Sequence, residues 1–237
     1  MKKVFKSEIY KLFCSKTIYI SIILIFIYSI LVNIIYLIDK IDVILLYQNF
    51  NDEFLLLYLV LIIYFASAII TDEFVYNTII DLQDKSIILT KIIICLLYLI
   101  FLFLFSLIIC YDVSLLIFKN VFISFEIVSN LIKNFLYLLP YLSIIILITL
   151  NIALVIKKAN LTIIFTYLIY FGSEYLNSFV LSHHLTKFYY LLSINFNYNR
   201  NYLIKDIVPL SYSIILNIII ILLLLILTNF IFKHLKK

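Results

Sequence analysis

Six long apolar segments constrain this chain more than any other feature of its sequence. Each is close to the ~20 residues that an α-helix needs to cross ~30 Å of hydrocarbon. A helix also satisfies its own backbone hydrogen bonds, which lipid cannot do. We therefore expect an all-α, polytopic membrane protein in which residues 1–237 form a single membrane domain. The six spans are predicted near residues 17–38, 54–71, 87–111, 135–156, 161–181 and 207–232.

The composition excludes an ordinary soluble domain and limits how the helices can pack. Hydrophobic residues make up 66% of the chain and charged residues 13%, whereas soluble domains average ~45–50% and ~25%. The chain has one glycine, Gly172, so helix contacts of the G-x-x-x-G kind are ruled out. Close packing must instead use Ser, Ala and Thr together with interdigitated Ile and Leu.

Residues 1–16, MKKVFKSEIYKLFCSK, are basic and amphipathic. A secretory signal peptide would need a short apolar core and a small-residue cleavage site. This segment has neither and continues directly into the first span. We expect a helix that lies on the cytoplasmic surface of the membrane. Its apolar face would consist of Val4, Phe5, Ile9, Leu12 and Phe13.

The distribution of basic residues predicts the orientation of the chain in the membrane. With the N-terminus inside, 12 of the 18 Lys and Arg residues fall in cytoplasmic segments, as membrane topology favours. Both termini are then cytoplasmic, and segments 39–53, 112–134 and 182–206 face outward. Because these bases lie at the ends of spans, the net charge of +5 does not indicate nucleic-acid binding. The expected location is the cell (cytoplasmic) membrane, in contact with lipid.

The cytosolic segment from Thr71 to Lys91 has a pattern that is too regular for a plain connector. Its polar positions are Glu73, Asn77, Asp81 and Asp84, and its apolar positions are Val75, Ile79 and Leu82. These spacings place the two sets on different faces of one helix. The pattern predicts a short amphipathic helix that presses against either the membrane interface or a partner protein.

Two motifs and the order of the segments resemble one family. The stretch KSEIYKLFCSKTIYI, from Lys6 to Ile20, is similar to an opening of the form E-x-x-K-L-x-x-S-K followed by a span. Such an opening, with six spans and an acidic-aromatic cytosolic segment after the second, resembles the permease subunit of type-2 ABC exporters. This bacterial class includes the lantibiotic-immunity and bacitracin-resistance permeases. The matching positions are Glu8, Lys11, Leu12, Ser15 and Lys16.

The second motif is EFVYNT…DKSIILTK, from Glu73 to Lys91. It is similar to the family's segment E-x-x-x-G-T … S/R-x-x-x-x-x-K. Asn77 stands where the family usually has glycine, and asparagine is among the few residues that visit the same left-handed backbone. The other matching positions are Glu73, Thr78, Ser86 and Lys91.

The resemblance implies partners, a mechanism and a cargo. In such exporters the N-terminal helix and the loop after the second span dock on a separate ATPase, and two ATPases drive two permeases, identical or homologous. The chain has no G-x-x-x-x-G-K-[ST] sequence, so we expect no ATP bound directly and no enzymatic activity of its own. The favoured cargo is a hydrophobic or amphipathic molecule such as an antimicrobial peptide. The residues implied in coupling to the ATPase are Glu8, Lys11, Lys16, Glu73, Asn77, Thr78, Ser86 and Lys91. The alternative is a non-ABC scaffold or accessory subunit without a transport cycle.

A few polar residues within the spans are candidates for a substrate path. Glu174 is the one acid inside an apolar span, where a carboxylate costs ~2.5–3.5 kcal/mol and usually has a function. It would instead lie at the outer interface if the fifth span ended near Tyr170. Asn33, Asn151 and Asn217 either line a path or hydrogen-bond between helices, and the second role is favoured.

The sequence shows no pattern typical of a metal site or a membrane hydrolase. His183 and His184 are adjacent, so on a helix they point about 100° apart, and no third ligand stands near them. Cys14, Cys95 and Cys110 have no ligand-like spacing. We interpret these cysteines as small apolar packing residues.

Overall fold

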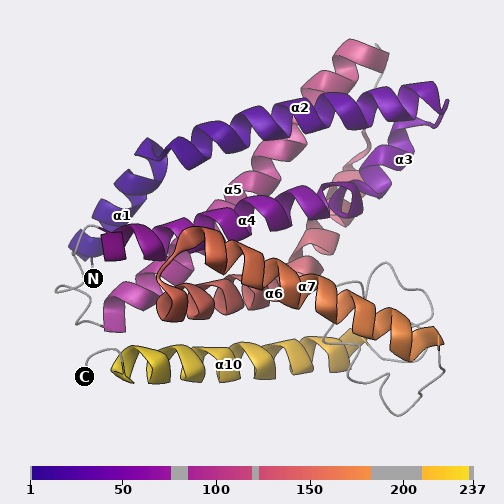
Figure 1. Ribbon diagram of the computed structural model, residues 1–237. Helices are drawn as coiled ribbons and strands as arrows, with labels where there is room; N and C mark the ends of the chain where they lie inside the picture. The colour runs from indigo at the N-terminus through magenta and orange to yellow at the C-terminus, as the bar shows by residue number, and fades with distance from the viewer. Residues whose placement is uncertain (1, 76–84, 119–122, 183–209, 235–237) are drawn as a thin grey trace. The chain divides into compact units, whose positions relative to one another are not determined.

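The computed structural model describes residues 2–75, 85–118, 123–182 and 210–234 (Figure 1). Within these ranges the chain is helical apart from short connections and contains no strand, which confirms the all-α class. The helices are α1 (Lys2–Cys14), α2 (Lys16–Ile38), α3 (Val43–Gln48), α4 (Phe50–Val75), α5 (Lys85–Phe118), α6 (Phe125–Ile156), α7 (Ala159–Ser182) and α10 (Leu210–His234).

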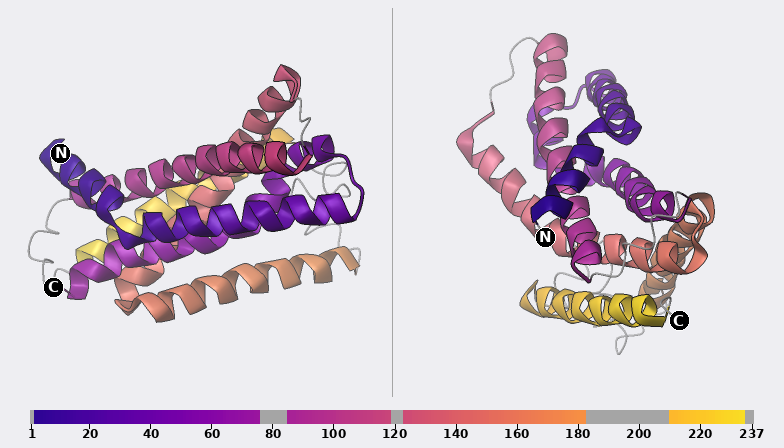
Figure 2. Two further views of the ribbon diagram at one scale, coloured as in Figure 1. Left: turned by 90° about the horizontal axis from the view of Figure 1, so that it is seen from above. Right: turned by 90° about the vertical axis from the view of Figure 1, so that its left-hand side faces the viewer.

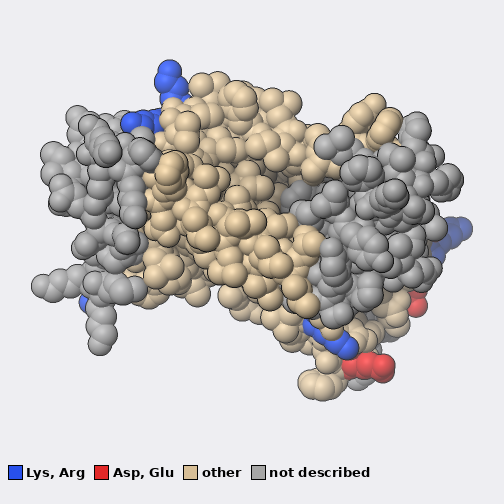
Figure 3. All heavy atoms as spheres, turned by 90° about the horizontal axis from the view of Figure 1, so that it is seen from below, with Lys and Arg blue, Asp and Glu red and all other residues tan. Residues whose placement is uncertain are grey.

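Helices α2, α4, α5 and α6 are long and apolar enough to cross a membrane, which indicates a membrane-embedded protein. The described apolar parts of α7 and α10, Ala159–Ser173 and Ile215–Ile231, are shorter. The structure therefore bears out four of the six expected spans, and the last two remain predictions. On the face drawn in Figure 3, most of the described surface consists of residues other than Lys, Arg, Asp and Glu.

Several helices extend beyond the apolar runs that predicted them. The second span was expected near 54–71, but α4 occupies Phe50–Val75. The fourth was expected near 135–156, but α6 begins at Phe125. Each extension is a polar turn or more outside the apolar run, such as the Asp52 and Glu53 first turn of α4. Acidic residues there interact favourably with the positive end of the helix dipole, so the helix continues although its hydropathy falls.

The chain divides into two compact units. The first consists of Met1–Phe65 and Asp84–Tyr137, and the second consists of Ala66–Gln83 and Leu138–Lys237. Helices α4 and α6 each contribute one segment to each unit. In the second unit, α6 and α7 are joined only by Lys157 and Lys158, and Lys157 has a positive φ of 59°. The connection between these two helices is therefore a tight basic turn.

In the first unit, α2 and α5 run in the same direction. The hydroxyls of Ser21 and Tyr98 are hydrogen-bonded, and Asn33 Nδ2 donates to Cys110 Sγ at 3.5 Å. Both pairs are separated by 77 residues, so the two helices keep one register along this stretch. Figure 2 shows α2 and α5 from two further directions.

Helix α4 runs opposite to α5 in the same unit. Tyr58 in α4 is hydrogen-bonded to Ser106, and the ring of Phe65, further along α4, lies 4.2 Å from the ring of Tyr98. As the position in α4 increases, the partner's position in α5 decreases. The order α2, α4, α5 is therefore up, down, up, as three successive membrane crossings require.

Small and polar side chains bring α2 and α5 together. The buried positions of α2 recur every three or four residues and include Ser21, Ser29 and Asn33, all fully buried. The opposite face exposes large apolar side chains such as Ile23 and Leu31. A helix with one close-packed face and one exposed apolar face suits contact with a neighbouring helix on one side and lipid on the other. Serine thus takes the role that glycine has in G-x-x-x-G helix contacts.

Asn33 connects the two helices through its whole carboxamide. Its Nδ2 donates to the Ser29 carbonyl at 2.8 Å as well as to Cys110 Sγ, and its Oδ1 accepts from the Ser114 hydroxyl at 2.7 Å. Ser114 also lies 2.7 Å from the Cys110 carbonyl, and it accepts a bond from Tyr47 of α3 at 2.8 Å. The result is one buried polar network that joins α2, α3 and α5.

We expect Asn33→Leu to lower the stability of the protein by about 1 kcal/mol, because interhelical polar contacts in membranes average ~0.6 kcal/mol and two are lost. The cost stays moderate because Ser114 keeps Tyr47 and the Cys110 carbonyl as partners. The measurement is the thermal unfolding midpoint of the purified protein in mild detergent. Asn160→Leu, at an exposed position of α7, is the matched control and should leave the midpoint unchanged. Equal midpoints for both variants would contradict the network's structural role.

Candidate functional site

The N-terminal motif and the last residues of the second motif lie at one end of the first unit. Helix α1 packs against both α2 and α5. Because α2 and α5 are parallel and Ser21 lies beside Tyr98, the helix that precedes α2 lies next to the early turns of α5. Figure 1 shows α1 and the start of α5 at the same end of the unit. The N-terminal motif and the last part of the second motif are therefore neighbours in space.

The described ranges contain only some of the residues implied in coupling. Lys16 is the first residue of α2 and is exposed. Glu8 and Lys11 lie in α1, Glu73 lies in the last turn of α4 and Ser86 in the first turn of α5, but their side chains are outside the described part. Asn77 and Thr78 lie outside the described residues altogether. Of the segment Thr71–Lys91, in which the amphipathic helix was expected, Thr71–Val75 belongs to α4 and Lys85–Lys91 belongs to α5. Residues 76–84 between them also lie outside the described residues.

Lys91 differs from a surface contact residue. Its side chain is fully buried, in the second turn of α5 and one turn before the buried Cys95. A lysine in such a place interacts with other groups of its own protein. The structure therefore places Lys91 inside the helix packing near the start of α5, and not on a surface that could touch a partner.

The second unit holds the residues predicted for a substrate path. Asn151 in α6 is buried, and its Nδ2 donates to the Leu224 carbonyl of α10 at 3.5 Å. This contact supports the structural role that we favoured. The Oδ1 atoms of Asn151 and of Asn217 in α10 are both buried and have no hydrogen-bond partner among the described residues. No described contact joins the two side chains.

Glu174 lies in α7, whose helix continues to Ser182. The helix itself therefore does not end at Tyr170. The apolar stretch whose side chains are described, Ala159–Ser173, stops directly before the glutamate, so both positions of Glu174, inside the span and at its outer interface, stay predictions. The side chain of Glu174 is outside the described part.

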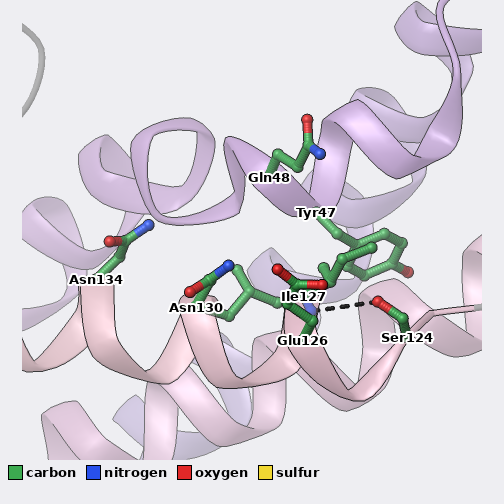
Figure 4. A pocket seen from close by; sticks show the side chains of 8 residues that line it. Tyr47, Gln48, Ser124, Glu126, Ile127, Asn130 and Asn134 are labelled. Atoms are coloured by element: carbon green, nitrogen blue, oxygen red, sulfur yellow. Dashed lines mark hydrogen bonds between the residues drawn. The ribbon is translucent and has the colours of Figure 1, made fainter.

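The first unit also contains a polar cleft that the sequence did not lead us to expect. It has a volume of about 530 Å³ and lies between α3 and the first turns of α6. Figure 4 shows its walls: Tyr47 and Gln48 come from α3, and a row of polar side chains comes from α6. That row is Glu126, Asn130 and Asn134. Ser124, Ile127 and Leu131 complete the lining.

The walls of the cleft are held by hydrogen bonds to the interior of the unit. The Tyr47 hydroxyl donates to Ser114, and burial raises the pKa of Tyr47, so the hydroxyl keeps its proton at neutral pH. On the opposite wall, Asn51 Nδ2 donates to the Leu131 carbonyl at 3.0 Å. Ser124 caps α6 by accepting from the backbone N–H of Ile127 at 3.4 Å. These bonds fix both sides of the cleft to α4 and α5.

A sequence signal for this cleft existed in the segment that we assigned to an outer loop. Glu126, Asn130 and Asn134 recur every four residues, which places them on one face of a helix. We missed them because the fourth span was predicted from its apolar run, which begins ten residues later than α6 itself. An apolar stripe of Val128, Leu131, Ile132 and Phe135 accompanies the polar one, so the sequence also carried the pattern of an amphipathic helix here.

The described ranges contain no group of three His, Cys, Asp or Glu side chains that could hold a metal ion. Cys95 and Cys110 are buried and reduced, as small packing residues would be. His183 and His184 lie outside the described residues.

Comparisons with protein-family models, with curated proteins and with solved structures found no match.

The cleft and the α1 end of the first unit should be accessible from opposite sides of the membrane. Ser114, which bonds the cleft residue Tyr47, also bonds Asn33 near the far end of α2, so the cleft lies at the end opposite α1. In a Cys14→Ser background we expect Asn130→Cys to react with a membrane-impermeant thiol reagent applied outside intact cells. Lys16→Cys, at an exposed position, should react only after the cells are opened. The buried Cys95 and Cys110 should stay unlabelled, and the reverse pattern would overturn the predicted orientation.

Proposed function

We propose that this chain is the membrane-spanning permease subunit of an ABC exporter, driven by a separate ATPase subunit. The observation that carries the proposal is the packing of α1 against α5, because it brings the N-terminal motif beside the last residues of the second motif in the first unit. The motifs are 50 or more residues apart in the sequence, so nothing local requires them to meet. A single docking surface for one partner gives both of them a reason to be there.

The alternation of the first three long helices supports the same proposal. Within the first unit, α2, α4 and α5 run up, down and up, and α5 begins at the end where α1 lies. The predicted amphipathic helix belongs to the connection between α4 and α5. Under the predicted orientation it faces the cytosol, which is where an ATPase would bind.

The chain must receive its energy from a partner if it transports. It lacks a phosphate-binding loop, and a single glycine is too few to build one. In the proposed assembly, two ATPase subunits move the α1 helices and the connecting segments of two permease subunits, identical or homologous. The buried Lys91 and the close contact of α2 with α5 then pass that movement into the spans.

The proposed cargo is a hydrophobic or amphipathic molecule, with an antimicrobial peptide favoured. The exposed faces of the helices are almost wholly apolar, and those of α2 and α10 carry large aliphatic side chains along their length. A cargo that partitions into the membrane could approach such faces without leaving lipid. The function would then be immunity to the peptide or its export.

The first test is purification of the tagged chain from native membranes in mild detergent, followed by identification of co-purifying proteins. We expect a stoichiometric soluble subunit with a phosphate-binding loop. Glu73→Ala combined with Asp81→Ala should remove that subunit without loss of membrane insertion, because both acids lie on the polar stripe of the docking segment.

The matched control is Asp39→Ala combined with Asp112→Ala, which removes two exposed acids from the opposite end of the same unit. This variant should keep the ATPase subunit. If the unaltered chain is isolated without an ATPase under several detergent conditions, the exporter proposal fails. The chain would then be a scaffold or accessory subunit, and its cytosolic segment an interfacial helix.

A further inference from the structure

We propose that the cleft between α3 and α6 binds a ligand through a protonated amine, with Glu126 as the counter-ion and Asn130 and Asn134 as hydrogen-bonding partners. As a statement about binding, this stands without the exporter proposal. It rests on that proposal only in assigning the cleft a role, which is recognition of the cargo on the outer side.

The charge of the cleft favours a cation. Glu126 is the one acidic side chain among the described residues that line the cleft, and these include no Lys, Arg or His. The surrounding outer segments are also acidic. Their described acids are Asp39, Asp42, Asp52, Glu53, Asp112 and Glu126, against the described bases Lys40 and Lys133. A field of this sign attracts a cationic ligand and raises its rate of association.

The asparagines supply hydrogen bonds of both kinds. Each carboxamide has one acceptor oxygen and an NH₂ group with two donors. Asn130 and Asn134 are exposed, project from the same face of α6 one turn apart, and have no hydrogen bond to another described residue (Figure 4). They are therefore available to a ligand without breaking a contact that holds the protein together. With Glu126 one turn before them, they form a row of three polar groups.

The size of the cleft and its stiffness fit a bound molecule. A volume of 530 Å³ lies within the ~300–1,000 Å³ that is usual for small-molecule sites. The apolar side chains of Ile127 and Leu131 lie between the polar ones and would contact the methylene groups of an aliphatic amine. Because Tyr47 and Leu131 are fixed by hydrogen bonds to the interior, the ligand would not have to order these walls.

A purely structural role explains only part of this arrangement. Glu126 lies in the first turn of α6, where a carboxylate interacts favourably with the helix dipole. That interaction accounts for the acid but not for two asparagines that follow it on the same face and line the same cleft. Asparagine is also a poor helix former, so two of them cost stability at positions where they gain no internal bond.

The test measures binding of two probes to the purified full chain in detergent by isothermal titration calorimetry at moderate salt. Spermidine offers amines alone, and trilysine amide offers amines together with peptide groups. We expect saturable binding of at least one probe. Glu126→Gln should weaken it at least tenfold, because it removes the counter-ion but keeps the shape of the side chain.

Two further variants separate the site from the general acidity of the surface. Asp112→Asn removes an exposed acid that does not line the cleft, so it should leave the affinity within twofold. Asn130→Ala should weaken trilysine amide about threefold. An equal loss of affinity for spermidine would show that Asn130 contacts the amine. A loss of affinity for trilysine amide alone would show that it contacts the peptide groups.

The proposal is overturned if neither probe binds, or if Glu126→Gln and Asp112→Asn weaken binding equally. These outcomes do not depend on the ATPase. If the probes bind but no ATPase co-purifies, the chain is a non-ABC protein with an amine-binding site. If an ATPase co-purifies but no probe binds, the chain is an exporter subunit that recognises its cargo elsewhere.

Discussion

The structure depends on hydrogen bonds between side chains that are buried away from water. Inside the membrane, a buried carboxamide or hydroxyl must find its partner on another helix or on its own backbone. Asn33 and Ser114 meet this requirement together, and Tyr47 joins them from α3. These contacts determine which faces of α2 and α5 meet. The polar groups come together at only one orientation of each helix about its own axis. The apolar side chains then fill the remaining space without having to specify the pairing.

The sequence predicts the helices well where hydropathy decides them and poorly where it does not. The first span was placed near 17–38, and α2 occupies Lys16–Ile38. The start of α6 was placed ten residues too late, because its first turns carry Glu126 and Asn130 and are held by a cap and by contacts to α4. The short helix α3 was not expected at all. Its six residues are too few for a periodic signal, and its start depends on Asp42, which accepts from the Ile44 N–H.

The candidate sites, too, could be predicted from the sequence only in part. Sequence motifs could identify the segments that meet at the α1 end, but not that Lys91 is buried, because motif position says nothing about exposure. The cleft required knowledge of which helix lies opposite the polar row of α6, and only the fold brings α3 there. For Asn151, the contact that the structure describes is to a backbone carbonyl, which is invisible to any pattern of side chains.

The constant register between α2 and α5 also limits how these helices can move. A slide of one turn would place Asn33 level with Ser106 or Ser114, and both hydroxyls could still bond its carboxamide. The same slide would place Ser21 level with an isoleucine or a leucine instead of Tyr98. One end of the pair therefore tolerates a shift of register, while the other end resists it. Because a helix slides along its axis as a whole, the Ser21–Tyr98 contact opposes a one-turn slide of the entire pair, although Asn33 alone would find a new partner.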